Sequence, residues 1–148
     1  MAVRIRPAMA EDLQTLGELK LRASLALAEH VEEIKALPEA RVVPGEHLPF
    51  VFVAEEDGRI LGFATVLPIE DGVELEDMFV DPGHWRQGIG RALVEEAAAR
   101  ARAMGAKALR VVANSRGFYD ACGFEQIGEV QTAFAPAPVM MLPLISRS

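Results

Sequence analysis

Three consecutive apolar runs separated by two short turns constrain the fold of this chain most strongly. Residues 50–55, 60–67 and 73–80 are apolar and β-prone. The first connection contains Asp57-Gly58 and the second contains Asp71-Gly72, and Asp-Gly is typical of tight hairpin turns. We therefore expect three antiparallel strands in succession, each joined to the next by a turn.

A long amphipathic helix follows the third run. Within residues 88–104, apolar side chains recur at helical spacing and form one face, and Gly105 is placed to end the helix as a C-cap. An apolar run at 109–113 then predicts a buried strand. Because a helix between two strands of one sheet is typical of a parallel connection, the complete sheet should be mixed.

Shorter elements flank this central part. The sequence predicts a strand at 3–6 ended by Pro7, a helix from Glu11 to about Ala28, short helices at 30–37 and 116–122, and strands at 124–130 and 139–144 separated by Pro136 and Pro138. The chain contains no internal repeat and no low-complexity linker. We expect one domain that spans residues 1–148.

Composition limits the classes of protein and site. A chain with 51% hydrophobic and 25% charged residues is not disordered. Cys122 is the only cysteine, which excludes an internal disulfide framework and a zinc site built from several cysteines, so we expect no metal. No apolar stretch reaches the roughly 18–20 residues that span a bilayer, and the first residues lack a long apolar core. We expect a cytoplasmic protein that binds no membrane.

The turn between the third strand and the long helix is a candidate anion site. Gly88 and Gly90 open the helix, and Arg86 and Arg91 flank them. The first helical turn leaves backbone N–H groups unpaired, and the helix dipole favours an anion there. The alternative interpretation is that the glycines only permit close packing. No Gly-Lys-Ser/Thr follows, and Leu93 stands where a dinucleotide fingerprint has its third glycine.

The charge of the whole chain restricts the partners of such a site. The formal net charge is −7, which argues against a general nucleic-acid binder because that function needs a broad basic face. A small anionic ligand held by a few local cations remains compatible with an acidic protein.

The order of these motifs resembles the GNAT superfamily of acetyl-CoA-dependent N-acetyltransferases over nearly the whole chain. The matching features are the opening Ile5-Arg6-Pro7-Ala8, the strand end Val80-x-Pro82, the helix start Gly88-x-Gly90, the pair Phe118-Tyr119 and the following Gly123-Phe124. The resemblance implies an α+β fold with a central, mostly antiparallel mixed sheet flanked by about four helices. One departure is Trp85, three residues before the first glycine, where the family usually has Gln or Arg.

The resemblance also implies where acetyl-CoA, the cosubstrate, would bind. The pyrophosphate would lie on the backbone amides of the turn, and the pantetheine arm would pair with the preceding strand as an additional strand does. The implied cofactor-binding residues are Met78, Phe79, Val80, Arg86, Gln87, Gly88, Ile89, Gly90 and Arg91, with Asn114 as a further contact.

An enzyme of this family needs an acid and a base. Tyr119, the only tyrosine, occupies the Phe-Tyr position and is expected to protonate the departing thiolate; a packed aromatic side chain is the alternative. For the base we expect Glu76, then Glu74 and then Asp77, on the strand that leads to the cofactor. The alternative is that the two glutamates simply face solvent.

The acceptor would be a primary amine of a small molecule or peptide. An acidic rim after the first helix would favour cationic amines, although charged residues of this kind also line solvated helix faces. The residues concerned are Glu29, Glu32, Glu33, Glu39 and Glu46, set against Lys35 and Arg41. The apolar run at 139–142 is either central in the sheet or at a homodimer contact.

Two functions of other classes stay open. A non-catalytic acyl-CoA-binding sensor or partner module would need neither Tyr119 nor a strand carboxylate. A nucleotide-phosphate binder would be stabilised by ATP or NAD instead of coenzyme A.

Overall fold

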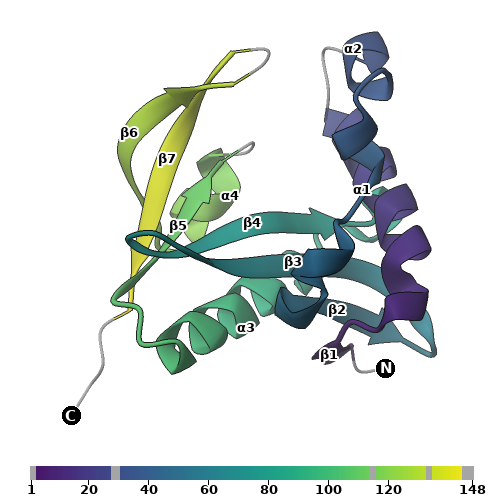
Figure 1. Ribbon diagram of the computed structural model, residues 1–148, viewed down its shortest axis with the longest axis horizontal. Coiled ribbons are helices and arrows are strands. Elements are labelled where there is room, and N and C mark those ends of the chain that lie inside the picture. Colours follow the sequence, from purple (N-terminus) through teal and green to yellow (C-terminus); the bar gives the residue numbers. More distant parts are fainter. Residues whose placement is uncertain (1–2, 28–30, 114–115, 133–134, 145–148) are drawn as a thin grey trace. The chain divides into compact units, whose positions relative to one another are not determined.

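The computed structural model describes residues 3–27, 31–113, 116–132 and 135–144. These residues form a seven-stranded sheet in which hydrogen-bonded neighbours lie in the order β1-β2-β3-β4-β5-β7-β6 (Figure 1). The strands are β1 Arg4–Pro7, β2 Val51–Glu56, β3 Arg59–Ile69, β4 Gly72–Val80, β5 Ala108–Val112, β6 Glu125–Gln131 and β7 Pro136–Pro143. The α-helices are α1 Leu13–Leu27, α2 Val31–Lys35, α3 Ile89–Ala103 and α4 Arg116–Ala121, and the 3-10 turns are η1 Ala10–Asp12, η2 Pro38–Arg41, η3 Gly45–Phe50 and η4 Pro82–His84.

The pairing of the strands confirms a mixed, mostly antiparallel sheet. β4 and β5 are parallel, whereas β1–β2, β2–β3, β5–β7 and β6–β7 are antiparallel. Within the described residues, no helix is both long enough and apolar enough to cross a membrane.

The chain divides into two compact units, which are described separately below. The first unit comprises Met1–Thr65 and Asp77–Leu93, and the second comprises Val66–Glu76 and Val94–Ser148. β3, β4 and α3 therefore each supply residues to both units. The assignment of residues 1–148 to one domain stays a prediction.

The first unit is built on the predicted hairpin. Asp57 and Gly58 have φ angles of 53° and 79°, and positive φ at both central residues is the conformation that suits the twist of a two-residue hairpin. The turn pairs Glu56 with Arg59 at the junction of β2 and β3. The tight hairpin turn predicted from Asp57-Gly58 is thus confirmed.

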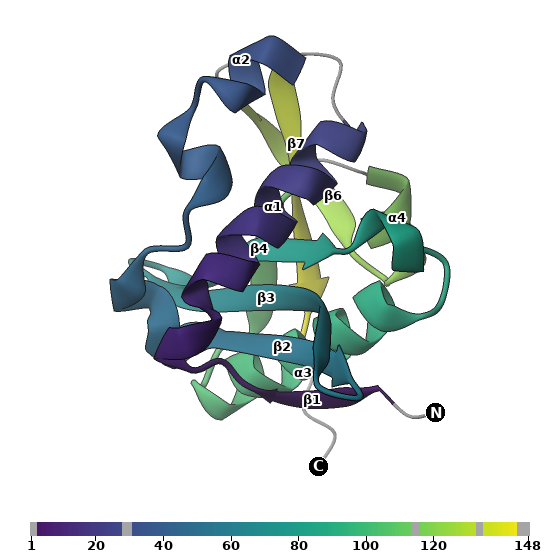
Figure 2. The same ribbon diagram turned by 90° about the vertical axis from the view of Figure 1, so that its right-hand side faces the viewer.

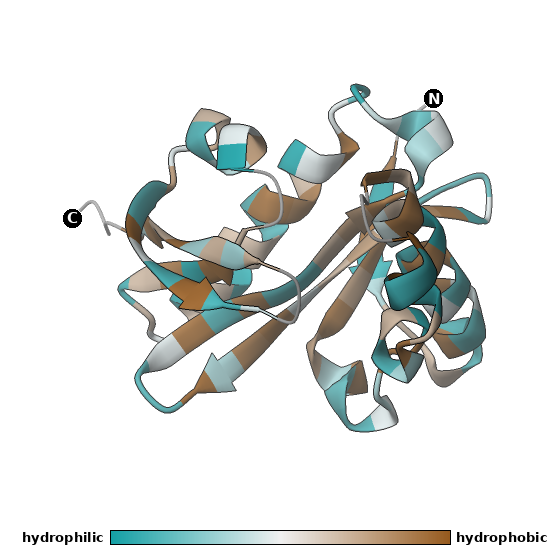
Figure 3. Ribbon diagram, turned by 90° about the horizontal axis from the view of Figure 1, so that it is seen from above, coloured by the Kyte–Doolittle hydropathy of each residue, from teal (hydrophilic) through white to brown (hydrophobic). Residues whose placement is uncertain are grey.

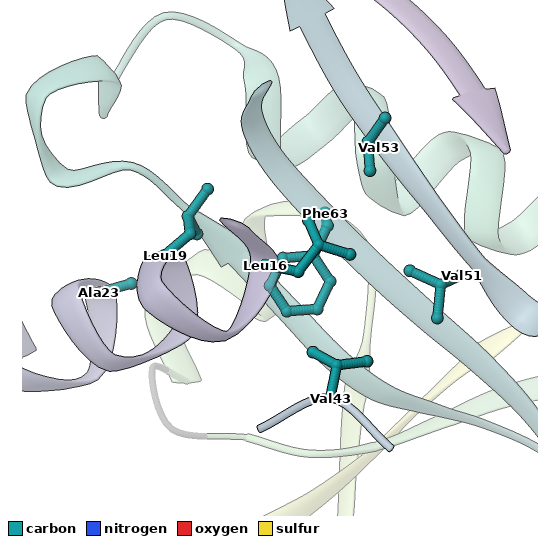
Figure 4. Packing of buried hydrophobic residues seen from close by; sticks show 7 residues of the cluster. All are labelled: Leu16, Leu19, Ala23, Val43, Val51, Val53 and Phe63. Atoms are coloured by element: carbon teal, nitrogen blue, oxygen red, sulfur yellow. The ribbon is translucent and has the colours of Figure 1, made fainter. Parts of the chain in front are cut away.

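Helix α1 covers one face of β2 and β3 (Figure 2). Leu16 and Leu19 of α1 are fully buried with Val51 and Val53 of β2 and with Phe63 of β3 (Figure 4). In Figure 3 the hydrophobic colour concentrates on strands of the sheet while the helices are mixed in colour. This difference is expected where strands are covered on both faces and helices on one.

The other face of β3 receives the start of α3. A Cβ atom built on Gly62 would lie 2.9 Å from Phe79 O, 3.1 Å from Leu93 Cδ1 and 3.4 Å from Ile89 Cγ2. Glycine at this position therefore lets the first turn of α3 approach the strand closely, so the glycine sets the position of the helix start against β3.

In the second unit, β7 differs from the sequence prediction. The strand begins at Pro136 instead of Val139, and Pro138 pairs with Glu129 of β6. Pro138 also accepts a hydrogen bond from Ala113 N, just beyond β5, so its missing N–H faces the region past the end of that strand. Val139 and Met140 are buried, as expected for the interior position of β7 in the sheet.

Two helices end as predicted. Gly105 after α3 and Gly123 after α4 have φ angles of 84° and 95°. At each end the residue after the glycine donates to a carbonyl five residues back, from Ala106 to Ala101 and from Phe124 to Tyr119, both at 3.0 Å. This is the Schellman pattern, which satisfies the last carbonyls of a helix.

Candidate active site

The turn that follows β4 is held by hydrogen bonds to β3 and within itself. Asp81 N donates to Leu61 O of β3 at 2.8 Å, and Asp81 O accepts from His84 N at 2.8 Å. The Asp81 carboxylate accepts from Gly83 N at 3.1 Å, and Trp85 Nε1 donates to Val80 O at 2.9 Å. The chain therefore leaves the strand in a defined conformation.

The turn then reaches the helix through two left-handed residues. Arg86 and Gly88 have φ angles of 65° and 82°, and both residues are exposed. The first helical hydrogen bond runs from Ala92 N to Gly88 O, so the amides of Ile89 and Gly90 precede the helical ladder. A left-handed residue followed by a helical one turns successive N–H groups toward a common concavity, which is a geometry suited to an anion.

Alternation of the backbone shows which residues of β4 can meet a ligand at its other edge. Asp81 N points to β3, so the N–H and C=O of Val80 and Met78 point to the opposite edge. The register with β5 covers Val73–Leu75, which lie before these residues. Phe79 has its backbone groups toward β3, and its ring lies 5.7 Å from that of Phe63.

Two ion pairs join α1 to this part of the first unit. Lys20 Nζ lies 3.6 Å from Asp77 Oδ1, with 17% and 7% of the two side chains exposed. Arg22 Nη2 lies 2.9 Å from Asp81 Oδ2. Neither contact was predicted from the sequence, because a pairing between distant segments has no short-range signal.

Tyr119 lies on α4 in the second unit and is 3% exposed. Its ring makes edge contacts with Phe118 and Phe124, at centroid distances of 5.1 and 5.2 Å. Burial, with a smaller contribution from Cys122, raises the pKa of the Tyr119 hydroxyl. The hydroxyl therefore keeps its proton throughout the neutral range, as a proton donor must.

The two predicted strand carboxylates differ in their surroundings. Glu74 faces Arg110 directly across the parallel β4–β5 pair, and its Oε1 accepts from Arg110 Nη1. Glu76 is exposed. Asn114, the further predicted cofactor contact, lies outside the described residues.

The predicted residues thus form two groups. Met78, Phe79, Val80 and the turn of residues 86–91 belong to the first unit, and Glu74, Glu76 and Tyr119 belong to the second. Sequence reasoning missed the indole hydrogen bond of Trp85. The one available signal was that an aromatic residue with a single N–H donor stands in the turn.

The structure thus combines a mixed sheet with an exposed turn between β4 and α3, whose first amides precede the helical ladder. A profile described as the Acetyltransferase (GNAT) family matches residues 18–124. This match spans more than half of the chain, and the chain belongs to the GNAT acetyltransferase family.

Individual relatives agree with this assignment. The N-acetyltransferase family 8 member 3 of Rattus norvegicus is 30% identical over 100 residues, which are 60% of this chain and 44% of the rat protein. The chain thus spans less than half of that relative.

Two crystal structures share the fold. A GCN5-related N-acetyltransferase (Aminotransferase, Class-II) from Rhodopseudomonas palustris has a TM-score of 0.82 at 21% identity, with 97% of each chain covered. The PaiA N-acetyltransferase of Thermoplasma acidophilum, in complex with coenzyme A, has a TM-score of 0.80 at 23% identity, with 97% of this chain and 99% of that chain covered.

Proposed function

We propose that the chain is an acetyl-CoA-dependent N-acetyltransferase that acts on a primary amine of a small molecule or peptide. The observation that carries this proposal is the exposed turn at Arg86 and Gly88, whose left-handed residues precede the start of α3 in a chain of the GNAT family. The coenzyme A complex of the T. acidophilum relative supports the choice of cosubstrate.

The turn supplies the groups that bind the diphosphate. The amides of Gly88, Ile89 and Gly90 would donate to its oxygens, as backbone amides at a helix start do for anions. Arg86 and Arg91 would add charge-assisted hydrogen bonds, and Gln87 is a further donor from the same turn. Asn114 is retained as a contact on the resemblance alone.

The edge of β4 supplies the groups that bind the pantetheine arm. Met78 presents its backbone N–H and C=O groups, and Val80 its N–H, to the edge opposite β3, so an extended ligand with amide groups can pair there. Phe79 would contribute through its side chain, which holds the strand on Phe63. An amide-bearing arm fits this edge better than a plain alkyl chain, because only amides use both kinds of backbone group.

The chemical step requires two protons to leave the ammonium form of the acceptor and one to reach sulfur. An alkylamine with a pKa of about 10.4 is mostly protonated at neutral pH, so it must release one proton to solvent before its nitrogen can attack. Glu76, directly or through water, would accept the second proton as nitrogen attacks the thioester carbonyl. A C–N bond forms and the C–S bond breaks. Tyr119 would donate its hydroxyl proton toward the departing sulfur and be reprotonated from solvent.

Glu74 is the second choice as base for a geometric reason. Its ion pair with Arg110 engages one carboxylate oxygen, so less of this carboxylate is open to an incoming amine. Asp77, the third choice, is placed similarly by Lys20. Glu76, the first choice, lies at the surface, where an amine and water reach it.

The acceptor would meet exposed carboxylates in the segments that follow α1. Glu32, Glu33, Glu39 and Glu46 lie in α2, η2 and η3, and the side chain of Glu32 is 85% exposed. Exposed carboxylates of this kind would attract a cationic amine over several ångströms, and the attraction would weaken with salt. Polyamines, aminoglycosides, lysine and peptide N-termini therefore form the first panel of acceptors.

A non-catalytic acyl-CoA-binding module is the second candidate. The ion pairs of Glu74 with Arg110 and of Asp77 with Lys20 favour it, because they engage two of the three strand carboxylates that could act as the base. Such a module would bind acetyl-CoA and release no coenzyme A with any amine.

Calorimetry with coenzyme A and a thiol-release assay over the amine panel test the proposal. We expect binding by the wild type, turnover with at least one amine, and a loss of kcat of about 100-fold in Tyr119→Phe and Glu76→Gln, within the range of general acid–base catalysis. Glu125→Gln, on the exposed strand β6, is the control for a lost surface carboxylate. Binding without turnover would favour the sensor, stabilisation by ATP or NAD alone would favour a nucleotide binder, and no heat from coenzyme A would overturn the proposal.

A further inference from the structure

Trp85 closes the turn after β4 with its side chain. It is the only tryptophan of the sequence, and its indole Nε1 donates to Val80 O at 2.9 Å. The residue is nevertheless 38% exposed. Burial of the ring alone therefore does not explain the position of the side chain, and the hydrogen bond is its specific contact.

The carbonyl that accepts the Trp85 hydrogen bond, Val80 O, lies on the edge of β4 opposite β3, where the pantetheine arm would pair. Asp81 N points to Leu61 O of β3, so Val80 O points the other way. A strand-like ligand on that edge would otherwise compete for this acceptor. The indole N–H of Trp85 already donates to Val80 O. Backbone pairing between β4 and such a ligand would therefore end at Val80 N–H, where the chain leaves the strand.

The residue after Trp85 is held in a strained conformation. Arg86 has a φ of 65°, a region in which a residue with a Cβ atom is disfavoured and persists only when its surroundings hold it. Arg86 is exposed, so close packing does not provide that restraint. The Trp85–Val80 hydrogen bond is the side-chain contact immediately before Arg86, and a weaker contact between His84 Nδ1 and Gln87 Oε1, 3.3 Å apart, spans this residue.

We propose that Trp85 is a positioning residue for the anion-binding turn. Its N–H, bonded to Val80 O, holds Arg86 in the left-handed conformation, and Arg86 in turn presents the amides around Gly88 to the diphosphate of coenzyme A. The inference rests on the proposed function for the identity of the ligand. The effect of Trp85 on the backbone conformation of Arg86 does not depend on which ligand binds.

Two substitutions separate the indole N–H from the ring. Trp85→Phe keeps an aromatic ring and removes the donor, whereas Trp85→Gln removes the ring and keeps a side-chain N–H donor. We expect the Kd for coenzyme A to rise about tenfold in Trp85→Phe and less than about threefold in Trp85→Gln, the difference expected for one lost hydrogen bond that also leaves an acceptor unsatisfied. The KM for acetyl-CoA should rise in parallel while kcat stays within about twofold, because the turn binds and does not react.

A double-mutant cycle with Arg86→Gly tests the coupling itself. Glycine adopts the left-handed conformation without steric cost, so in the Arg86→Gly background the Trp85→Phe substitution should weaken coenzyme A binding by less than about threefold. The cycle cancels the loss of the guanidinium, which is common to both Arg86→Gly proteins. Equal losses in the two backgrounds, or equal losses for Trp85→Phe and Trp85→Gln, would overturn the proposal.

A ligand-free measurement distinguishes failure of this proposal from failure of the proposed function. In urea unfolding without ligand, Arg86→Gly should raise the midpoint more in the wild type than in Trp85→Phe, because strain is relieved only where it is present. If coenzyme A does not bind the wild type but this difference is found, the assigned ligand is wrong and the coupling stands. If coenzyme A binds and the difference is absent, Trp85 does not position Arg86.

Discussion

Arg22 of helix α1 donates a hydrogen bond to Asp81 of the turn after β4, with Nη2 and Oδ2 2.9 Å apart across 59 residues of sequence. The other carboxylate oxygen of Asp81 accepts from Gly83 N. Burial opposes the ionisation of Asp81, but the Gly83 amide and the Arg22 guanidinium outweigh it and hold the pKa of this carboxyl below its usual range. One side chain thus shapes the turn and ties it to α1.

The two partners should differ in their effect on stability. Arg22→Met should cost about 0–1 kcal/mol, because its side chain is 51% exposed and exposed ion pairs contribute little. Asp81→Ala should cost about 1–2 kcal/mol, because it also removes the acceptor that caps the turn. Urea unfolding at pH 7 measures both. Equal costs would mean that the Gly83 contact contributes nothing.

Asp12 should make the protein sensitive to acid. Its carboxylate accepts from Arg6 at 2.9 Å and from Met9 N at 2.8 Å, and the Arg6 guanidinium, against the opposing effect of burial, holds the pKa of Asp12 below 3.8. A carboxyl with a lowered pKa in the folded state adds stability above its unfolded pKa and loses that contribution as the pH falls through the folded pKa.

The matching substitution is Asp12→Asn, compared with the wild type by urea unfolding between pH 7 and pH 2.5. We expect the variant to be less stable by about 1–3 kcal/mol at pH 7 and the difference to shrink below about pH 4. A difference that stays constant over this range would show that the ionised form of Asp12 is not the stabilising form.

Much of the fold could be predicted because its signals are local. Asp57-Gly58 indicates a hairpin turn because both residue types accept the left-handed conformation that the turn requires. Gly105 and Gly123 indicate helix ends because glycine accepts the left-handed conformation after the last helical residue. β7 was predicted too short because a proline inside a strand usually weakens the assignment. Pro138 is tolerated because it lies beyond the end of β5, and that relation depends on the register of two distant strands.

The candidate site was predictable in its residue types and much less so in its contacts. Gly88 and Gly90 mark the turn because a glycine pair at a helix start has a local meaning. Whether Glu74 is a base depends on Arg110, which lies 36 residues away, and that pairing follows only from the parallel register. The left-handed φ of Arg86 has no sequence signal at all, since arginine disfavours it.

Two glycines in helices should respond oppositely to alanine. A Cβ atom on Gly17 of α1 would lie 2.3 Å from Arg41 O, whereas one on Gly117 of α4 meets nothing within 4 Å. Alanine favours a helix by about 1 kcal/mol over glycine, so Gly117→Ala should stabilise the protein by up to about 1 kcal/mol. Gly17→Ala should destabilise it by about 1–3 kcal/mol, because a backbone oxygen must move.

Thermal and urea unfolding of the two alanine variants measure these opposite signs, and each variant is the control for the other. A stabilised Gly17→Ala protein would mean that the segment around Arg41 moves away from α1 at little cost. In that case the close approach of η2 to the helix would contribute little to the stability of the first unit.

Tyr119 should resist ionisation as long as the protein is folded. It is the only tyrosine of the chain, so the absorbance of tyrosinate near 295 nm reports this residue alone. Burial raises the pKa of its hydroxyl above 10.0. A group with a raised pKa in the folded state contributes stability that is present below its unfolded pKa and is lost as the pH rises above that value.

We therefore expect the tyrosinate absorbance to appear together with unfolding above about pH 10, measured in parallel by circular dichroism. Tyr119→Phe should remove the absorbance change and make stability less dependent on pH in this range. Ionisation of Tyr119 should cause no decline in the rate of acetyl transfer below pH 10. A native protein that titrates with a midpoint at or below 10 would contradict the burial of the hydroxyl, and with it the reason that Tyr119 keeps its proton for the departing sulfur.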